Sequence, residues 1–314
     1  MKKTLFAIGE ALIDFIPEQK GCDFSEVKSF SPKVGGAPAN VLGAFARLGG
    51  KSELMTQLGD DGFGRKIFDE LKGFNIGLKN VLFTKKANTA LAFVSLNTDG
   101  NRTFSFYRNP SADMLYDGGN LTDKTFEDCF ALHFCSVSLG NFPMKEAHKK
   151  AIEFAKKNGA LISFDPNLRF PLWENKEDLK NAVCEFLPMA DIIKVSDEEI
   201  EFITGTPDID LGCRKLLENA KVVLCTCGAK GAYAYAKDFK VCAVSKPVCA
   251  KDTTGAGDAF IGSFLYSLYK NGFDKEKIDK IDEKTLETFA DLSVEYCSKS
   301  VLKYGAIESY PDSL

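Results

Sequence analysis

The stretch Lys251-Asp-Thr-Thr-Gly-Ala-Gly-Asp-Ala-Phe260 joins an apolar region near Val248 to a segment with helical spacing. Gly255 and Gly257 carry no Cβ, so the backbone there can approach a ligand closely. The first turn of the following helix presents unpaired N–H groups and the positive end of the helix dipole, which together bind anions. Asp258 lies in this turn, where a carboxylate either caps the helix or acts as a base beside a phosphate. The stretch therefore predicts a phosphate-binding turn between a strand and a helix.

Two better-known phosphate motifs do not fit this chain. The run Gly255-Ala-Gly-Asp-Ala-Phe260 ends in Phe, where the dinucleotide-binding fingerprint needs Gly or Ala. The run Gly50-Lys51-Ser52 is similar to the end of a P-loop, but Phe45 stands where that motif needs its first glycine.

Strand-like and helix-like segments alternate along the rest of the chain. Apolar residues at helical spacing predict helices at 40–48, 63–71, 144–158, 176–186, 198–203, 211–218, 256–269 and 286–301. Apolar or alternating runs predict strands at 5–8, 91–96, 103–107, 131–137, 161–164, 191–195, 222–226 and 231–235. This alternation, regular from residue 130 onward, implies an α/β fold with a mainly parallel sheet covered on both faces. With no linker or repeat in view, we expect residues 1–314 to form a single domain.

Two early segments do not fit the alternation. The runs 91–96 and 103–107 flank Asp99-Gly100, a strong hairpin-turn signal. Together with residues 16–33 they predict a small antiparallel flap over one end of the sheet, with lid segments at about 16–33 and 88–110.

Composition narrows the classes of protein that the chain can be. It has 314 residues, a formal net charge of −4, 45% hydrophobic and 27% charged residues, and no basic tail, so nucleic acid is not an expected partner. No apolar stretch approaches the ~20 residues of a membrane span. The apolar run Leu5–Ile8 is too short for a signal peptide, because Glu10 and Asp14 follow it. Ten cysteines without a CxxC pair, beside only two histidines, indicate reduced thiols in a cytoplasmic protein rather than a zinc site.

Several motifs along the chain carry a resemblance to a known family. They are Gly35-Gly-Ala-Pro-Ala-Asn40, Ala46-Arg-Leu-Gly49, Gly59-Asp-Asp-Gly-Phe-Gly64, Phe106-Tyr-Arg-Asn-Pro-Ser-Ala-Asp-Met-Leu115, Asp165-Pro-Asn-Leu-Arg169 with Leu172-Trp173, Lys194-Val-Ser-Asp-Glu-Glu199, Thr226-Cys-Gly-Ala-Lys-Gly231, Asp252-Thr-Thr-Gly-Ala-Gly-Asp258 and Gly305-Ala-Ile307. In order and spacing they resemble the ribokinase-like (PfkB) carbohydrate kinases, and most closely the fructokinase branch. The resemblance spans nearly the whole chain. It implies a Rossmann-like three-layer α/β/α fold with a small β lid.

The resemblance also implies roles at the sugar site. Asp258 is similar to the base that accepts the proton of the sugar hydroxyl, and Gly255, Ala256 and Gly257 to the anion hole for the γ-phosphate. The positions that resemble sugar binders are Asp14, Gly35, Gly36, Asn40, Tyr107, Arg108 and Arg169. Structural readings stay open beside these, because two glycines can simply form a turn, Asn40 can cap a helix, and Arg169 can lie on the surface. Asp14 follows apolar Leu12-Ile13, so a carboxylate there would need partners.

A second group of positions resembles the family's nucleotide and metal sites. Those expected beside ATP are Lys194, Glu199, Thr226, Gly228, Lys230, Gly231 and Gly257. Glu199 resembles a carboxylate that supports Mg²⁺ through water, although the acidic run that it ends can also serve as the charged start of a helix. Many relatives hold K⁺ through backbone oxygens, and the matching positions are Asp252, Thr254, Ser300, Lys303, Gly305 and Ser309.

Two positions depart from the family pattern. Ser196 stands where the family usually has Asn in an Asn-x-x-Glu motif, and Val294-Glu295 stands where many members carry Asn-Ala near the adenine. The adenine contacts are therefore not predicted.

Three hypotheses of function follow from the sequence. The first is transfer of phosphate from ATP to the 6-hydroxyl of fructose. The second is a kinase of 2-keto-3-deoxygluconate or of another small sugar. The carboxylate of 2-keto-3-deoxygluconate could bind Arg108 and Arg169. The third is a non-catalytic sugar-sensing protein on the same scaffold, which Asp258, Gly255 and Gly257 argue against. A homodimer through the lids is also expected, since exposed strand edges favour pairing.

Overall fold

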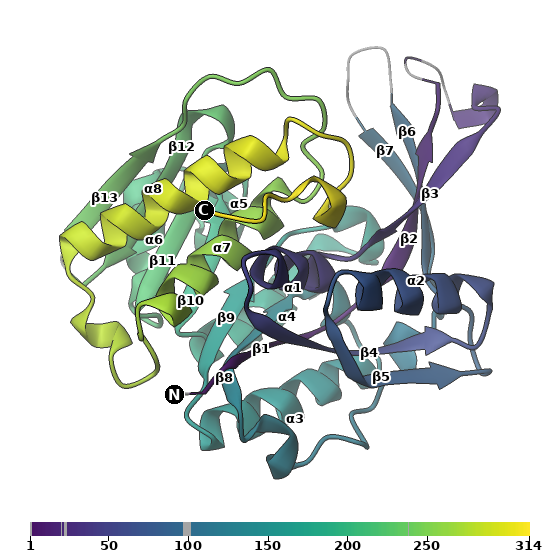
Figure 1. Ribbon diagram of the computed structural model, residues 1–314, viewed down its shortest axis with the longest axis horizontal. Coiled ribbons are helices and arrows are strands. Elements are labelled where there is room, and N and C mark those ends of the chain that lie inside the picture. The colour runs from purple at the N-terminus through teal and green to yellow at the C-terminus, as the bar shows by residue number, and fades with distance from the viewer. Residues whose placement is uncertain (1, 20, 22–23, 97–101, 238) are drawn as a thin grey trace.

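The computed structural model describes residues 2–19, 21, 24–96, 102–237 and 239–314. Its main element is a nine-stranded sheet with α-helices on both faces (Figure 1). In spatial order the strands are β13 (Phe239–Val244), β12 (Gly231–Ala236), β11 (Val222–Thr226), β10 (Ile192–Ser196), β9 (Leu161–Asp165), β8 (Cys129–Cys135), β1 (Thr4–Ile8), β4 (Lys51–Gly59) and β5 (Gly77–Thr84). The run from β11 to β5 is parallel, while β12 and β13 are added antiparallel at one edge.

Two hydrophobic cores lie on the two faces of this sheet. Strand β1 shows why: Leu5 and Ala7 pack into one core, whereas Phe6 and Ile8 pack into the other. Alternate residues of a strand point to opposite faces, so a central strand buried on both sides is apolar throughout. The expected three-layer α/β/α arrangement is confirmed.

The helices divide between the two cores. One core takes residues from α1 (Ala37–Arg47), α2 (Gly62–Gly73), α7 (Ala256–Lys270) and α8 (Glu283–Ser300). The other takes residues from α3 (Pro143–Lys157), α4 (Lys176–Phe186), α5 (Asp197–Thr204) and α6 (Ile209–Leu217). Every helix predicted from the sequence is present, with ends shifted by a few residues.

A second, four-stranded sheet stands apart from the first and contains β3 (Phe30–Gly35), β2 (Leu12–Pro17), β6 (Leu91–Leu96) and β7 (Arg102–Tyr107) in that order (Figure 1). The segments that did not fit the α/β alternation therefore do form one small sheet. The prediction of an antiparallel flap is wrong in one respect, because β2 and β6 pair in parallel. This pairing joins the two hairpins, which are far apart in the sequence. The predicted turn at Asp99-Gly100 lies outside the described residues.

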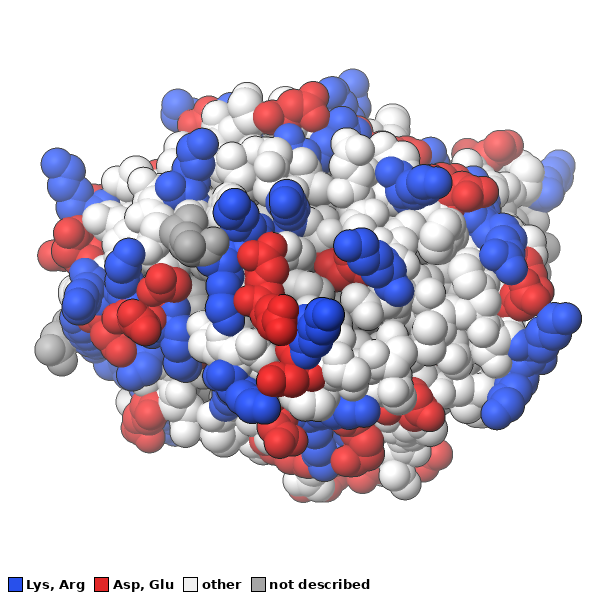
Figure 2. Space-filling view, turned by 60° about the horizontal axis from the view of Figure 1, so that its bottom comes forward, with Lys and Arg blue, Asp and Glu red and all other residues white. Residues whose placement is uncertain are grey.

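The surface carries both signs of charge. In Figure 2, Lys and Arg side chains lie among Asp and Glu side chains across the face shown. Among the described residues, no helix is long and apolar enough to cross a membrane. The nine described cysteines are all free thiols; five are buried, and Cys184, Cys242 and Cys249 are exposed.

Candidate active site

Asp258 lies in the first turn of α7, at the end of the helix that points toward the small sheet. Gly255 precedes the helix with φ of 73°, a left-handed conformation that glycine adopts without strain. The Asp258 residue is only 7% exposed, and its Oδ2 accepts a hydrogen bond of 2.8 Å from Nδ2 of Asn40 in α1. The carboxylate is therefore held by Asn40 of the neighbouring helix α1, and the N-cap residue of α7, Gly255, has no side chain to cap the helix.

The protonation of Asp258 is set mainly by its burial. Burial raises the pKa of Asp258 from 3.8 to about 6, and the negative charge of Asp165 adds to the rise. The hydrogen bond from Asn40 and the charges of Lys194 and Arg169 lower the pKa and offset part of this effect. A carboxyl group with a pKa near 6 is ionised at neutral pH yet binds a proton readily, which suits a general base.

The glycine turn before Asp258 is closely packed on both sides. A Cβ on Gly255 would collide with the hydroxyl of Tyr310, which donates a hydrogen bond of 2.8 Å to the Gly255 carbonyl. A Cβ on Gly257 would lie 2.9 Å from Nζ of Lys194. The backbone here is therefore free of side chains just where the helix N-terminus presents its N–H groups.

Lys194 brings a positive charge to the same place. It is 6% exposed and forms an ion pair of 3.0 Å with Oδ2 of the fully buried Asp165. Burial opposes the charge of Lys194, but Asp165 and Glu199 outweigh it and raise the pKa of Lys194 above its usual value. The ammonium group thus stays charged beside Gly257, where it can stabilise an anion at the turn.

Asp258, Asn40 and Gly255 line a cavity of about 200 Å³ between the small sheet and the carboxyl ends of the main sheet. Of the predicted sugar-site residues, those that line it are Asp14, Gly36, Asn40, Arg169, Gly255 and Asp258. The Oδ1 atom of Asn40 is buried and has no hydrogen-bond partner within the described part of the chain. A buried acceptor without a donor is destabilising unless a bound molecule supplies one. The cavity therefore offers at least one acceptor, Oδ1 of Asn40, to a ligand that carries a hydrogen-bond donor.

The two glycines at the start of α1 are required by close contacts. A Cβ on Gly35 would collide with the carboxylate of Asp14 in the adjacent strand β2. Gly36 has φ of 111°, and a Cβ there would lie 2.5 Å from the Glu10 carbonyl oxygen. Gly35 therefore leaves room for the Asp14 side chain, and Gly36 leads the chain into α1.

Three predicted sugar contacts, Gly35, Tyr107 and Arg108, do not line this cavity. Tyr107 is 63% exposed, and its ring packs against Phe93 with centroids 5.4 Å apart. Successive residues of a strand point to opposite faces, and the preceding residue, Phe106, lines the cavity instead. Arg108 is buried, and its Nε donates a hydrogen bond of 3.0 Å to Asp113.

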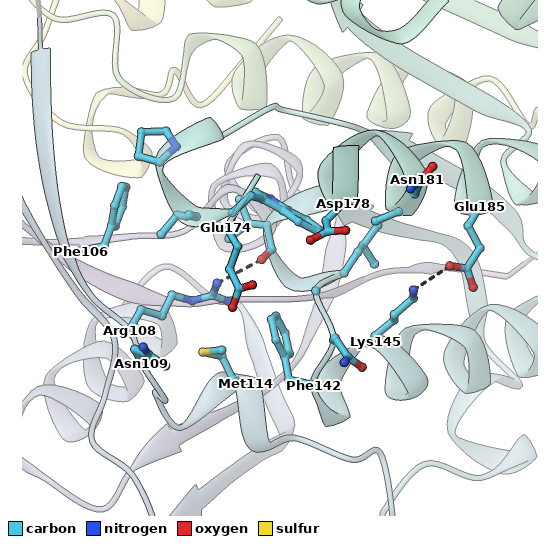
Figure 3. Close-up of a pocket in the computed structure, with 18 residues that line it drawn as sticks. Phe106, Arg108, Asn109, Met114, Phe142, Lys145, Glu174, Asp178, Asn181 and Glu185 are labelled. Atoms are coloured by element: carbon cyan, nitrogen blue, oxygen red, sulfur yellow. Dashed lines mark hydrogen bonds and ion pairs between the residues drawn. The ribbon is translucent and has the colours of Figure 1, made fainter. Parts of the chain in front are cut away.

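Arg108 lines a second, larger cavity of about 770 Å³ (Figure 3). This cavity shares Phe106, Val137 and Leu172 with the smaller one, so the two adjoin. Figure 3 shows Lys145 paired with Glu185 along its wall, at 2.7 Å, and Glu174 and Asp178 also face it. The larger cavity combines aromatic rings with amides and carboxylates, and its two cations are both paired to carboxylates.

The positions expected beside a nucleotide lie at the carboxyl ends of β10 and β11. Ser196 and Thr226, the last residues of these strands, are paired in the ladder. The turn Gly228–Lys230 follows and is exposed to solvent. Gly231 has φ of 105°, and a Cβ there would collide with the Ala243 carbonyl oxygen, so this glycine is required for the β12–β13 pairing. Ligands of parallel α/β sheets bind at this edge.

Glu199 is held firmly by two backbone groups. Its Oε1 accepts a hydrogen bond of 2.6 Å from the N–H of Leu168, and its Oε2 accepts one of 2.8 Å from the N–H of Ser196. The second bond completes a capping box at the start of α5. A carboxylate offers about four lone-pair positions, so Glu199 keeps the capacity to accept a hydrogen bond from a metal-bound water. Ser196 supplies the hydroxyl half of this capping box.

The positions expected around a monovalent cation lie in three loops that meet beside α7. Asp252 ties them together, because Oδ1 accepts a bond of 3.0 Å from the N–H of Thr254 and Oδ2 one of 3.0 Å from the N–H of Gly305. The hydroxyls of Ser300, at the end of α8, and of Ser309 each donate a hydrogen bond of 2.7 Å to the carbonyl three residues earlier in the chain. Backbone oxygens are therefore the groups that these loops could offer to a cation. Lys303 is exposed at the outer side.

The adenine-side departures from the family pattern are placed in α8. Val294 is buried in the core, and Glu295 forms an ion pair of 2.8 Å with Lys299 on the surface.

Sequence reasoning missed two buried carboxylates at this site. Glu10 is 3% exposed and lines the smaller cavity, although the sequence suggested only that its charge interrupts an apolar run. Asp165 is fully buried and was not given a role beyond its motif. Asp165 ends the apolar strand β9, and Glu10 lies two residues after the apolar strand β1. This position at the carboxyl ends of parallel strands was the signal that could have identified them.

Comparisons with known proteins agree with this geometry. Residues 2–313 match the model of the pfkB family carbohydrate kinases. The chain is 45% identical over 269 residues to probable fructokinase-2 of Arabidopsis thaliana, covering 85% of this chain and 82% of that one. Among solved structures, fructokinase from Xylella fastidiosa with bound ATP is similar with a TM-score of 0.91 and 32% identity, covering 99% and 96% of the two chains. Fructokinase from Vibrio cholerae O395, in a form bound to fructose, ADP and calcium ion, is similar with a TM-score of 0.87 and 31% identity over the same shares. A family match over nearly the full length, with motif residues gathered around one buried carboxylate, means that the chain belongs to the pfkB family of carbohydrate kinases.

Proposed function

We propose that this protein is a fructokinase, which transfers the γ-phosphate of ATP to the 6-hydroxyl of D-fructose and releases fructose 6-phosphate and ADP. The observation that carries the proposal is the buried carboxylate of Asp258, held by Asn40 at 2.8 Å in a cavity of sugar size. The names of its relatives support fructose as the acceptor, and one similar structure binds fructose together with ADP.

In this proposal the sugar occupies the smaller cavity with its 6-hydroxyl against Asp258. Asp258 accepts the hydroxyl proton as the new O–P bond forms, because a neutral hydroxyl is a poor nucleophile. The N–H groups at Gly255, Ala256 and Gly257 bind the transferred phosphoryl group, whose charge is spread over three oxygens. Asp14, Gly35, Gly36, Asn40 and Arg169 position the remaining sugar hydroxyls. Catalysis then consists of positioning and charge stabilisation, with no covalent enzyme intermediate required.

The nucleotide lies along the carboxyl ends of β10 and β11. Thr226, Gly228, Lys230 and Gly231 border its path, and Lys194 lies beside Gly257 with its positive charge toward the phosphates. Mg²⁺ bound to ATP would neutralise phosphate charge, and Glu199 would hold it through a water molecule. Lys194 remains in place for this role because Asp165 anchors its ammonium group.

A monovalent cation such as K⁺ fits the loops that Asp252 ties together. The positions are Asp252, Thr254, Ser300, Lys303, Gly305 and Ser309, chiefly through backbone oxygens. The cation would lie beside the turn that binds the phosphate and would stiffen it. Activity measured in K⁺ and in tetramethylammonium at equal ionic strength tests this assignment, and equal rates would contradict it.

The small sheet acts as a lid over the sugar. Leu12, Asp14 and Ile16 of β2 line the cavity, as do Val94 of β6 and Phe106 of β7. The opposite face of the sheet carries Phe15, Phe93 and Tyr107. The ring of Phe93 stacks on Phe15 and meets the ring of Tyr107 edge-on. This aromatic face supports a homodimer formed lid against lid, since an apolar face of this kind is stabilised by burial. A monomeric mass in solution would exclude the dimer.

Free thiols throughout the described chain support a reducing compartment, so we assign the protein to the cytoplasm.

The sugar specificity is tested by a panel of acceptors with saturating MgATP, compared by kcat/KM. Fructose should lead the panel. The alternative substrate, 2-keto-3-deoxygluconate, needs a cation for its carboxylate, and the buried Arg108 is already paired with Asp113. Preference for the keto acid would overturn the assignment as a fructokinase but leave the assignment as a carbohydrate kinase standing. No turnover with any sugar would instead favour a sensing protein.

A further inference from the structure

Glu10 is a buried carboxylate at the sugar cavity to which neither the motifs nor the proposed mechanism gives a function. It follows β1 and Gly9, is 3% exposed, and lines the smaller cavity together with Asp14 and Asp258. A buried ionised carboxylate is strongly destabilising unless hydrogen-bond donors surround it. Burial raises the pKa of Glu10, while the charge of Arg108 lowers it.

The protein supplies Glu10 with few donors. Oε2 accepts a hydrogen bond of 3.2 Å from the hydroxyl of Ser138, and the remaining hydrogen bond within the described residues comes from the backbone of Glu10 itself. A carboxylate offers about four lone-pair positions, so this side chain is only partly satisfied. The open positions face a cavity, and the occupant of that cavity can supply what the protein does not.

The orientation of the Ser138 hydroxyl is fixed from the other side. Nη2 of Arg108 donates a hydrogen bond of 3.1 Å to Oγ of Ser138. Because Arg108 uses the oxygen of Ser138 as an acceptor, the single hydroxyl hydrogen is left for Glu10. Arg108 lines the larger cavity and Glu10 the smaller one, so this chain of hydrogen bonds crosses the wall between the two cavities.

Arg108 is itself immobilised. Its Nη1 donates a hydrogen bond of 3.1 Å to the Val137 carbonyl, drawn as a dashed line in Figure 3, and its Nε donates one of 3.0 Å to Asp113. Asp113 is 1% exposed and neutralises the guanidinium charge at close range. Among the described residues no cation pairs directly with the carboxyl group of Glu10, and what it lacks is hydroxyl or N–H donors.

We propose that Glu10 accepts a hydrogen bond from one hydroxyl group of the bound sugar and makes the enzyme selective for sugars that carry that hydroxyl. Ser138 and Arg108 act as positioning residues that hold the Glu10 side chain in place. The inference deepens the proposed sugar-kinase function and rests on it. A substrate without the hydroxyl would leave the buried carboxylate short of donors, which is the condition that gives strong discrimination against deoxy analogues.

The test combines substitutions with deoxy substrates. Wild-type enzyme, Glu10→Ala and Glu10→Gln are assayed with fructose and with its 1-deoxy, 3-deoxy and 4-deoxy analogues at saturating MgATP. In the wild type, one analogue should have a kcat/KM lower than that of fructose by roughly 10–100-fold, as expected for a lost hydrogen bond to a charged group. In Glu10→Ala, the kcat/KM for fructose should fall to that for the same analogue, so that the ratio of the two kcat/KM values approaches one. Glu10→Gln keeps the shape and one acceptor and should give an intermediate ratio.

A structural role would give a different result. If Glu10→Ala lowers fructose and all analogues by one common factor, or leaves fructose unchanged, the inference is wrong. Ser138→Ala removes only one hydroxyl and guards against a folding defect; it should lower the same ratio partway without changing the KM for ATP. The matched control is Glu53→Gln. Glu53 is also a buried carboxylate, and it accepts a hydrogen bond of 3.2 Å from Nδ2 of Asn80. It does not line the cavity. That variant should keep the wild-type ratio.

The proposed function is judged separately, by the wild-type rates alone. Should another sugar prove to be the substrate, its own deoxy analogues take the place of those of fructose, and the ratio test decides the role of Glu10 unchanged. An inactive wild type would refute the proposed function and this inference together.

Discussion

The side-chain amide of Asn40 reaches across from α1 and donates a 2.8 Å hydrogen bond to Oδ2 of Asp258, 218 residues later in the chain. This bond stabilises the ionised form of Asp258 and is the largest of the influences that lower its pKa. It opposes the burial that raises the pKa to about 6.

Asn40→Ala should raise the pKa of Asp258 further, because burial then acts with less opposition. The base form of Asp258 is required, so activity falls as pH drops below the pKa. We expect the acidic limb of the kcat/KM profile near pH 6 in the wild type and at higher pH in the variant. Asn80→Ala is the matched control, since Asn80 donates a similar bond to the buried Glu53. An unmoved acidic limb in Asn40→Ala would separate Asn40 from the ionisation of Asp258.

Asp258→Asn should abolish turnover while sugar and ATP still bind. The amide keeps the shape of the side chain but cannot take the proton, so kcat should fall by roughly 10²–10⁴-fold. Rapid quench or steady-state rates, together with calorimetric binding of both substrates, check this. A variant with nearly wild-type kcat would show that Asp258 is not the base.

The same substitution should also stabilise the protein at neutral pH. The folded carboxyl group has a pKa of about 6 against a usual 3.8, so the wild type loses stability as pH rises through this interval. A neutral amide is spared that loss, which amounts to about 2–3 kcal/mol for a shift of this size. It can also donate to Oδ1 of Asn40, which now lacks a partner. The Tm difference between variant and wild type should grow from pH 4 to pH 7; a constant difference would contradict the assigned pKa.

Much of this fold could be predicted from the sequence, because most of its helices and buried strands have a clear apolar period. Strand β4 (Lys51–Gly59) was missed although it lies inside the sheet, between β1 and β5. Three of its buried residues, Ser52, Glu53 and Thr56, are polar, and the partner of Glu53 comes from the next strand. The strand therefore lacks the apolar run by which a buried strand is recognised in a sequence. The edge strands β5 and β13 were missed as well, and edge strands are less apolar than central ones.

The site divides in the same way. The glycine turn and Asp258 are contiguous in sequence and could be identified there. The position of the Arg108 side chain could not be predicted, because the residue pattern does not reveal that its guanidinium group donates hydrogen bonds to Asp113 and to the Val137 carbonyl. The parallel pairing of β2 with β6 depends on contacts between distant segments, and only the folded chain reveals it.

Asp14→Ala should raise the KM for the sugar far more than the KM for ATP. Asp14 lies on β2 at the cavity, and its loss would leave buried sugar hydroxyls without an acceptor. Glu18→Ala is the control, since Glu18 is an exposed carboxylate just beyond the same strand, bonded to Ser29. Equal effects of Asp14→Ala on both substrates would indicate a purely structural role.

The glycines of the turn should tolerate no side chain. Gly257→Ala places a methyl group 2.9 Å from Nζ of Lys194, which cannot retreat freely because Asp165 holds it. Gly255→Ala adds backbone strain at φ of 73° to a collision with Tyr310. Both should lose at least about 10²-fold in kcat, as when an anion-binding donor is removed. Gly62→Ala, at the start of α2 with open space around it, should keep full activity. Active Gly257→Ala enzyme would argue against an anion hole here.

The last prediction concerns the small sheet. Water left beside the γ-phosphate would compete with the sugar, so a kinase of a small hydroxyl compound gains from covering its site. Strands β6 and β7 carry cavity-lining Val94 and Phe106, and they belong to a sheet separate from the main one. Sugar binding should therefore slow amide hydrogen exchange in β6 and β7 more than in α3 (Pro143–Lys157), which packs with residues of β8 and β9 in one core of the main sheet. Hydrogen exchange followed by mass spectrometry, with and without fructose, measures this. Protection limited to the turn around Asp258, with β6 and β7 unchanged, would mean that this sheet is a fixed wall of the cavity and not a lid.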